Sequence, residues 1–255
     1  MLRTACIIPA RLEATRLPRK LLLKRSGKYV IQHVFERIQS LGVARVVIAT
    51  DSQEIQAAAE AFGAEALLTD AGHTSGTDRV AEAARLLGDD SLELIVNVQG
   101  DEPEIDPEHV GRLIETMEQG DDMGTLAEPL AAGDFERPQV VKLVCDAAGY
   151  ALYFSRAPIP YLEPTGAGSW PADLPLQPLR HVGVYAFRPA FLQAFCKLES
   201  APLERVERLE QLRALHYGHR IRVAVVEASG ARGIDTPEDY ERFLARLDEQ
   251  ERTGP

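Results

Sequence analysis

Strand-like and helix-like segments alternate through the first half of the chain, and this alternation restricts it to one class of fold. Four apolar runs have the length of buried strands: residues 5–8, 45–49, 64–68 and 94–98. The stretches that follow these runs carry apolar side chains three and four residues apart, as on one face of a helix, starting at Val30, Ile55, Val80 and Val110. Strands and helices in this order form a parallel sheet with helices on both faces. We therefore expect an α/β fold.

The pattern changes at about residue 123. Two strand-like runs flank the turn sequence Asp146–Gly149 and predict a hairpin. The predicted organisation is an α/β core at 1–122, a mixed, β-rich segment at 123–220 and a return to the core at 221–255. Further elements are expected in chain order: strands over 140–144, 150–154, 181–187 and 222–226, helices over 189–195, 207–217 and from 237 onward, and an exposed loop or lid over 163–178.

Composition argues against several classes of protein. The formal net charge of −11 disfavours nonspecific binding to nucleic acids or membrane surfaces, which needs a basic face. No apolar run approaches the roughly 20 residues of a membrane-spanning helix, and the apolar stretch before Arg11 is too short for a signal peptide. The three cysteines form no CxxC pair, and the histidines lack zinc-ligand spacing. We expect a cytoplasmic protein with reduced thiols, no membrane insertion and no nucleic-acid partner.

A basic loop follows the first predicted strand. From Pro9 to Lys28 the only acid is Glu13, against seven basic residues: Arg11, Arg16, Arg19, Lys20, Lys24, Arg25 and Lys28. Loops at the carboxyl ends of strands are where α/β sheets bind ligands. The loop contains neither a GxGxxG motif nor a P-loop. Two interpretations remain open: a solvated basic turn, or a site where side-chain cations and backbone N–H groups hold a polyanion.

Acidic and polar residues follow other predicted strands at the same edge of the sheet. Asp51 ends the second strand, Asp101 follows the fourth, and Ser75 or Thr77 caps the helix that carries Arg79. A carboxylate beside bound phosphates suits Mg²⁺, which one or two carboxylates and phosphate oxygens hold together. Asp101 is our candidate ligand, with a polar turn as the alternative.

Asp235 is the candidate for a second metal ligand. The residues after it have the pattern of a helix start, with Thr236 as N-cap and Pro237 in the first turn. That pattern explains Thr236 and Pro237 without requiring Asp235. In the middle segment, polar residues that suit either ion pairs or a hydroxylated, carboxylated substrate are Arg156, Arg180, His181, Glu210 and Gln211.

Eight sequence strings, in order from residue 7 to residue 239, resemble the 3-deoxy-manno-octulosonate (Kdo) cytidylyltransferase family. They are IIPARLEATRLPRK, VVIATD, HTSGTDR, VNVQGDEP, GYALYFSRAPIP, RHVGVYAF, LEQLRALHYG and GIDTPED. The first, second and fourth suit several sugar nucleotidyltransferases, whereas ALYFSR and LEQLR are more specific to the Kdo enzymes.

The resemblance implies a fold, a reaction and a set of site residues. The fold would be a Rossmann-like, glycosyltransferase-A-like nucleotidyltransferase, and the reaction would join CTP and Kdo into CMP-Kdo and diphosphate for lipopolysaccharide assembly. The implied catalytic residues are Arg16, Lys20, Asp101 and Asp235, with Mg²⁺ on Asp101 and Asp235. The implied CTP site is Ala10, Arg11, Arg16, Lys20, Thr50, Asp51, Ser75, Gly76, Arg79 and Gln99. The implied Kdo site is Gln99, Arg156, His181, Tyr185, Glu210 and Gln211, and the middle segment would form a homodimer interface.

One residue departs from the family pattern. The family usually has glycine before the loop lysine, where this chain has Arg19. Glycine permits positive φ, so arginine there must adopt negative φ or accept strain. No residue marks a general base, and metal-assisted ionisation of the sugar hydroxyl is our hypothesis. Two alternatives remain: a cytidylyltransferase for a related acid sugar such as 8-amino-Kdo or a sialic acid, and a non-catalytic nucleotide-sugar-binding protein.

Overall fold

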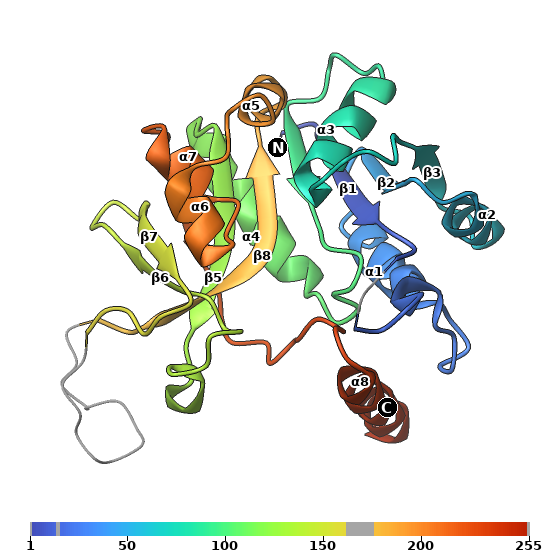
Figure 1. Ribbon diagram of the computed structural model, residues 1–255. Helices are drawn as coiled ribbons and strands as arrows, with labels where there is room; N and C mark the ends of the chain where they lie inside the picture. Colours follow the sequence, from blue (N-terminus) through green and yellow to red (C-terminus); the bar gives the residue numbers. More distant parts are fainter. Residues whose placement is uncertain (1, 14–15, 162–175, 254–255) are drawn as a thin grey trace. The chain divides into compact units, whose positions relative to one another are not determined.

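The computed structural model describes residues 2–13, 16–161 and 176–253. Within these residues the chain forms two compact units (Figure 1). The first contains residues 2–108 and 230–255, and the second contains residues 109–229. Most of the loop or lid predicted over 163–178 lies outside the described residues. No helix in the described part of the chain has the length and apolar character needed to cross a membrane.

The first unit contains a four-stranded parallel sheet. Its strands lie in the order β3-β2-β1-β4, with the central strand β1 buried along its whole length. The bounds are Thr4–Ala10 for β1, Arg45–Thr50 for β2, Glu65–Leu68 for β3 and Leu94–Asn97 for β4. All three pairings are parallel, and Ala10 at the end of β1 lies beside Thr50 at the end of β2. The predicted strands of the first half are confirmed, and their carboxyl ends share one edge.

Amphipathic helices connect the strands of this sheet. The structure has α1 at Val30–Gln39, α2 at Gln53–Ala61, α3 at Gly76–Leu86, the 3-10 turn η1 at Lys20–Leu22 and the C-terminal helix α8 at Pro237–Thr253. The N-cap of α3 is Ser75, whose Oγ accepts a hydrogen bond from Asp78 N at 3.1 Å. The helical stripes predicted from Val30, Ile55 and Val80 are confirmed because their apolar residues are buried.

The second unit is built around strand β5, Met123–Pro129. This strand pairs antiparallel with β8, Leu179–Phe187, and parallel with β9, Arg222–Val225. The predicted hairpin is confirmed as β6 and β7, at Lys142–Cys145 and Ala151–Ser155. The helices are α4 at Pro107–Thr116, which starts in the first unit, α5 at Pro189–Phe195, α6 at Pro202–Glu207 and α7 at Leu212–His216, with 3-10 turns at Met117–Gln119 and Ala132–Asp134.

Two expectations for this unit need correction. The helix predicted over 207–217 is confirmed only at Leu212–His216: α6 ends at Glu207, and Arg208 has a left-handed backbone with φ 55°, so α7 begins only at Leu212. Strand β5 is the second correction, because it is not among the strands expected from the sequence. Its first six residues are all buried, so the strand lacks the alternation of buried and exposed residues that reveals a half-exposed strand.

Candidate active site

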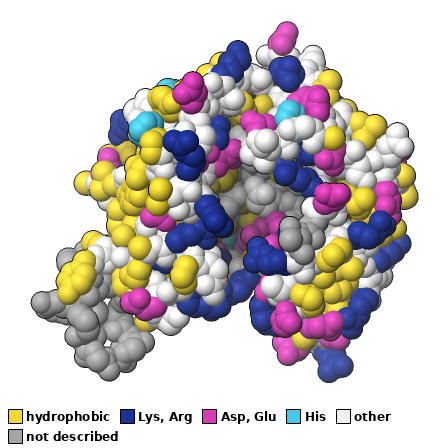
Figure 2. Space-filling model, in the orientation of Figure 1, with side chains coloured by type: hydrophobic (Ala, Val, Ile, Leu, Met, Phe, Trp, Pro, Cys, Tyr) yellow, Lys and Arg dark blue, Asp and Glu magenta, His cyan; other side chains and the backbone are white. Residues whose placement is uncertain are grey.

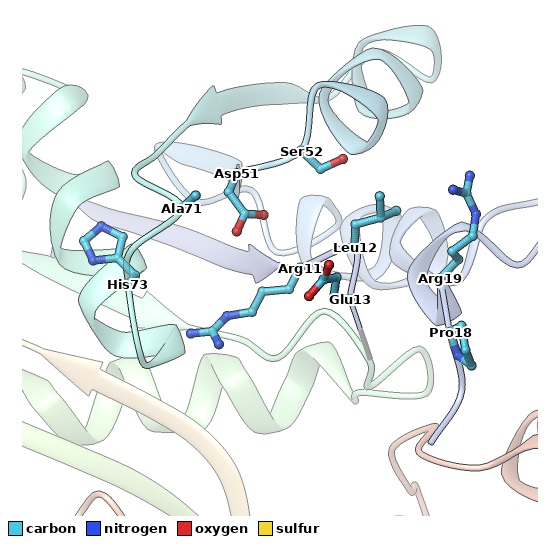
Figure 3. Close-up of a pocket in the computed structure, with 9 residues that line it drawn as sticks. All are labelled: Arg11, Leu12, Glu13, Pro18, Arg19, Asp51, Ser52, Ala71 and His73. Carbon is cyan, nitrogen blue, oxygen red and sulfur yellow. The ribbon is translucent and has the colours of Figure 1, made fainter. Parts of the chain in front are cut away.

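Two cavities lie at the carboxyl-end edge of the first unit's sheet and share Arg11 and Glu13 in their walls. The smaller, of about 320 Å³, is lined by Pro9, Arg11, Glu13, Arg16, Lys20, Leu21, Gly76, Gln99, Gly100, Asp101 and Asp235. The larger, of about 910 Å³, is lined by Arg11, Leu12, Glu13, Pro18, Arg19, Asp51, Ser52, Ala71 and His73. Figure 3 shows the Arg11 side chain and the Asp51 carboxylate pointing into the same space.

Lys20 joins two carboxylates that are far apart in the sequence. Its ammonium pairs with Asp101 and donates hydrogen bonds to Asp235 Oδ1 at 3.0 Å and to the carbonyl oxygen of Ile234 at 2.9 Å. Burial lowers the pKa of Lys20, but the charges and hydrogen bonds of Asp101 and Asp235 outweigh burial and raise the pKa above its ordinary value. Lys20 is therefore a permanent positive charge between the two acids at neutral pH.

The arginines of the basic loop have different partners. Arg16 Nη2 donates to the second oxygen of Asp235, Oδ2, at 2.9 Å. Arg19 pairs with Glu54 on α2. Its backbone is left-handed, with φ 59° and ψ 24°, so this arginine accepts the strain that a glycine would avoid. Arg16 and Arg19 are therefore each paired with an acid outside the basic loop.

The loop after β4 approaches β1 closely. A Cβ on Gly100 would lie 2.9 Å from the carbonyl oxygen of Pro9, so only glycine fits there. The next residue, Asp101, accepts a backbone hydrogen bond from Ile234 N at 2.8 Å. Gln99 donates from Nε2 to Asn97 Oδ1 at 3.3 Å and lines the smaller cavity. These contacts fix the loop that carries Asp101.

Arg79, which the resemblance assigns to the CTP site, is buried beside a residue of the larger cavity. Its side chain is fully buried and donates from Nη2 to Asp51 Oδ2 at 2.8 Å, with a second bond to Thr69. The buried Thr50 accepts a bond from Ser52 N at 3.1 Å. Arg79 and Thr50 therefore hold the end of β2 in place, while Asp51 and Ser52 face the larger cavity.

In the second unit Arg156 is held at both its backbone and its side chain. Its backbone N–H donates to the Glu207 carboxylate at 2.9 Å, and its carbonyl accepts from Lys142 Nζ at 2.6 Å. The guanidinium donates to the carbonyl oxygens of Glu207 at 2.8 Å and Pro138 at 3.1 Å. Burial lowers the pKa of Lys142, whose ammonium is bonded to backbone carbonyls. Arg156 thus ties two loops of this unit together.

His181 and Tyr185 lie on β8 with their ring centroids 5.3 Å apart. Burial raises the pKa of Tyr185 well above its ordinary value, and the charge of Glu210 adds to this effect. Gln211 is almost completely buried just before α7, and its Nε2 has no hydrogen-bond partner among the described residues. Of the predicted middle-segment residues, His181 and Tyr185 are thus in ring contact, and Glu210 lies near enough to Tyr185 to act on it through its charge.

Part of the larger cavity is formed by a residue outside the predicted site, His73. His73 lines it and pairs through Nε2 with Glu82 on α3, while Glu82 also accepts from Asp70 N at 2.8 Å. Burial and the backbone bond from Asp70 act on Glu82 in opposite directions, and the hydrogen bonds lower its pKa. The string that begins at His73 was recognised, but only its later residues were assigned to the site.

The cavities, the basic loop and the paired carboxylates are features of an enzyme that handles phosphorylated ligands. Residues 5–221 match the cytidylyltransferase family. The chain therefore belongs to the cytidylyltransferases, a class of nucleotide-transferring enzymes.

Individual relatives narrow this class. The chain is 52% identical to 3-deoxy-manno-octulosonate cytidylyltransferase of Anaeromyxobacter sp. (strain Fw109-5), with 97% of this chain and 98% of the relative covered. It is 47% identical to the enzyme of the same name from Acidovorax ebreus (strain TPSY), with 94% and 96% covered. A solved CMP:2-keto-3-deoxy-manno-octonic acid synthetase complexed with CTP matches with a TM-score of 0.88 and 38% identity, covering 97% of this chain and 99% of that one. The chain belongs to the 3-deoxy-manno-octulosonate cytidylyltransferases.

Proposed function

We propose that this enzyme transfers CMP from CTP to the anomeric hydroxyl of Kdo, which gives CMP-Kdo and diphosphate and activates Kdo for lipopolysaccharide assembly. The observation that carries the proposal is the contact of Lys20 with both Asp101 and Asp235 in a cavity that also contains Arg11 and Arg16. This contact supports the proposal because cations of this kind would neutralise a triphosphate and carboxylates would attract a metal ion. The likeness to the Kdo enzymes supports both substrates.

The basic residues are proposed to bind the triphosphate of CTP. Arg11 and Arg16 are exposed side chains on the cavity wall, and Lys20 is the more buried cation behind them. Because CTP and Kdo are both anions, their approach is repulsive until these cations neutralise the phosphates. Preorganised cations also stabilise the charge that develops on the leaving diphosphate. We assign Lys20 and Arg16 to this role.

Asp101 and Asp235 are proposed to hold Mg²⁺. Their side chains converge on one ammonium group, so both can reach a single cation, and hard carboxylate oxygens suit this metal. Mg²⁺ usually takes its remaining ligands from phosphate oxygens and water. When bound, Mg²⁺ supplies positive charge that polarises the α-phosphate.

The nucleoside half of CTP is proposed to lie in the larger cavity. Its wall combines apolar and hydrogen-bonding groups, including Leu12, Pro18, Asp51 and Ser52. The buried Arg79 and the capping Ser75 hold the loops around the larger cavity. The remaining residues of the proposed CTP site are Ala10 and Thr50, at the ends of their strands, and Gly76, in the wall of the smaller cavity.

The polar residues of the second unit are proposed to bind Kdo. His181 Nε2 lies 2.9 Å from Thr125 Oγ1, and the single hydroxyl proton of Thr125 is donated to the carbonyl oxygen of Val184 at 2.8 Å. Because a carbonyl only accepts, Thr125 Oγ1 must accept from His181 Nε2–H. The neutral ring of His181 then offers Nδ1 as an acceptor. The other proposed Kdo contacts are Arg156, Tyr185, Glu210 and Gln211.

The second unit is also the proposed homodimer interface. Figure 2 shows hydrophobic side chains gathered over α6 and β7. Val206 is 81% exposed and Leu152 is 60% exposed, and Leu203 is a further exposed apolar residue on α6. Contiguous apolar surface of this kind marks protein interfaces. Analytical ultracentrifugation of Val206→Lys against the wild type tests the assignment.

Release of diphosphate on mixing the protein with CTP, Kdo and Mg²⁺ tests the reaction. Diphosphate that forms with Kdo and not without it supports CMP transfer to the sugar. Omission of Mg²⁺ in a metal-free buffer tests the metal separately. Faster diphosphate release with 8-amino-Kdo or a sialic acid would assign a different acid sugar. Tight CTP binding without release of diphosphate from CTP in the presence of any of these sugars would indicate a non-catalytic binding protein.

A further inference from the structure

Asp239 in the first turn of α8 accepts three hydrogen bonds on one carboxylate oxygen. Its Oδ2 takes the N–H of Thr236 at 2.9 Å, the hydroxyl of Thr236 at 3.0 Å and the N–H of Asp235 at 3.1 Å. The Thr236 hydroxyl in turn accepts from Asp239 N at 3.2 Å. Reciprocal bonds between an N-cap residue and the third helical residue form a capping box, which stabilises a helix start. The bond to Asp235 N goes beyond that motif.

The Asp235 N–H belongs to the same peptide group as the carbonyl oxygen of Ile234. That oxygen accepts from Lys20 Nζ at 2.9 Å. The Asp239 carboxylate therefore accepts a hydrogen bond from the N–H end of this peptide group, and the Lys20 ammonium group donates one to its carbonyl end. Both hydrogen bonds involve a charged partner. Such bonds are shorter and stronger than neutral ones, and bonds at the two ends of a peptide polarise each other.

The orientation of this peptide group sets the direction of the Asp235 side chain. The peptide plane between Ile234 and Asp235 fixes the backbone from which the carboxylate projects, and Ile234 N donates to the Asp101 carbonyl at 2.8 Å. Arg242 pairs with the other oxygen of Asp239 and keeps that side chain in place. Residues 234 and 235 are therefore held in place by hydrogen bonds to Asp101, Lys20 and Asp239.

We propose that Asp239 is a positioning residue for Asp235, which it holds in the orientation needed to share a divalent cation with Asp101. This inference rests on the proposed Mg²⁺ site and goes beyond it, since Asp239 is not itself a ligand. Hydrogen-bond partners of metal ligands typically account for 10–100-fold in metal affinity. The helix cap alone predicts a loss of stability with no such effect on metal binding.

The affinity of the protein for Mn²⁺ separates these roles. It is measured at saturating CTP and without Kdo, from the EPR signal of the Mn²⁺ that remains free. Asp239→Ala is expected to weaken Mn²⁺ binding at least ~10-fold. The matched control Thr236→Ala removes the hydroxyl of the capping box but leaves Asp235 N on Asp239. It is expected to lower thermal stability and leave Mn²⁺ affinity within about 3-fold, well below the effect of losing a ligand's partner.

Asp239→Asn keeps an oxygen acceptor and is expected to retain most of the affinity. Equal Mn²⁺ affinity in Asp239→Ala and Thr236→Ala would overturn the positioning role. If Asp239→Asn lost as much Mn²⁺ affinity as Asp239→Ala, the effect would come from the charge of Asp239, and the positioning role would be overturned as well. Should Asp239→Ala not fold, Asp239→Ser replaces it with the same expectation. A wild type that binds no Mn²⁺ beyond that bound by CTP overturns the metal site itself and this inference with it.

Discussion

The ammonium group of Lys20 lies 3.0 Å from Asp235 Oδ1, although 214 residues separate the two in the sequence. The same group also pairs with Asp101. Lys20 therefore occupies the space between the two carboxylates that we assign to Mg²⁺. A divalent cation bound by Asp101 and Asp235 would compete with the ammonium for these oxygens and leave it available to a phosphate. In the proposed mechanism, binding of the metal and binding of the triphosphate would be coupled through this one side chain.

Lys20→Met is expected to lower kcat/KM for CTP at least ~10²-fold, the usual scale for loss of a preorganised charge. The free energy of unfolding should fall by only about 2 kcal/mol, because the two carboxylates lose one charged hydrogen-bond donor but remain partly exposed to water. Steady-state kinetics and urea denaturation measure the two effects. Lys24→Met is the matched control, since Lys24 is an exposed lysine of the same segment that lies over the Tyr29 ring. Equal kcat/KM values for both variants would remove Lys20 from phosphate binding.

Asp101→Asn and Asp235→Asn are each expected to lower turnover at limiting Mg²⁺ at least ~10²-fold. The amide keeps the size of the side chain but removes the negative charge that attracts a cation. Asp90→Asn is the control because Asp90 is exposed in the turn before β4. The turnover of each variant is measured as the rate of CMP-Kdo formation over a series of Mg²⁺ concentrations. Near wild-type turnover in both variants would exclude them from the mechanism.

The sequence was sufficient to predict that the strand ends share one edge of the sheet, but not which side chains contact one another there. Periodicity placed the strands and so brought the basic loop near Asp101, because parallel strands end at one edge. It could not show that Arg79 is buried against Asp51, since an arginine in the first turn of a helix has the same pattern whether it faces a ligand or the core. The break at Arg208 was also invisible, because the left-handed backbone there belongs to a residue that gives no turn signal.

Arg19→Gly is expected to stabilise the protein by about 1 kcal/mol. A non-glycine residue in the left-handed region costs about 1–2 kcal/mol, and the Arg19–Glu54 pair that the change removes is an exposed one that contributes little. Arg19→Ala is the control, because it removes the same ion pair but keeps the Cβ that causes the strain. Urea denaturation of the three proteins measures the difference. A glycine variant less stable than the alanine variant would show that this backbone conformation carries no strain.

His181 is expected to make the protein less stable in mild acid. Burial lowers the pKa of its ring to about 3, and the adjacent Arg180 charge adds to this effect. In the unfolded chain the pKa of a histidine is about 6.5, so between these values the unfolded state binds the extra proton and stability falls as pH falls. Among the described residues, Phe154, Tyr185 and Thr125 contact the ring, and none of these three supplies a compensating negative charge.

The size of the effect follows from the gap between the two pKa values. At pH 5 the penalty is at most about 2 kcal/mol relative to pH 7, reduced by the part of the ring that water reaches. His181→Gln keeps a donor for Thr125 Oγ1 but cannot titrate, so its loss of stability between pH 7 and pH 5 should be smaller than that of the wild type. Urea denaturation at both pH values gives the two differences. If they are equal, His181 is protonated equally in the folded and unfolded states, and its ring is not held neutral by burial.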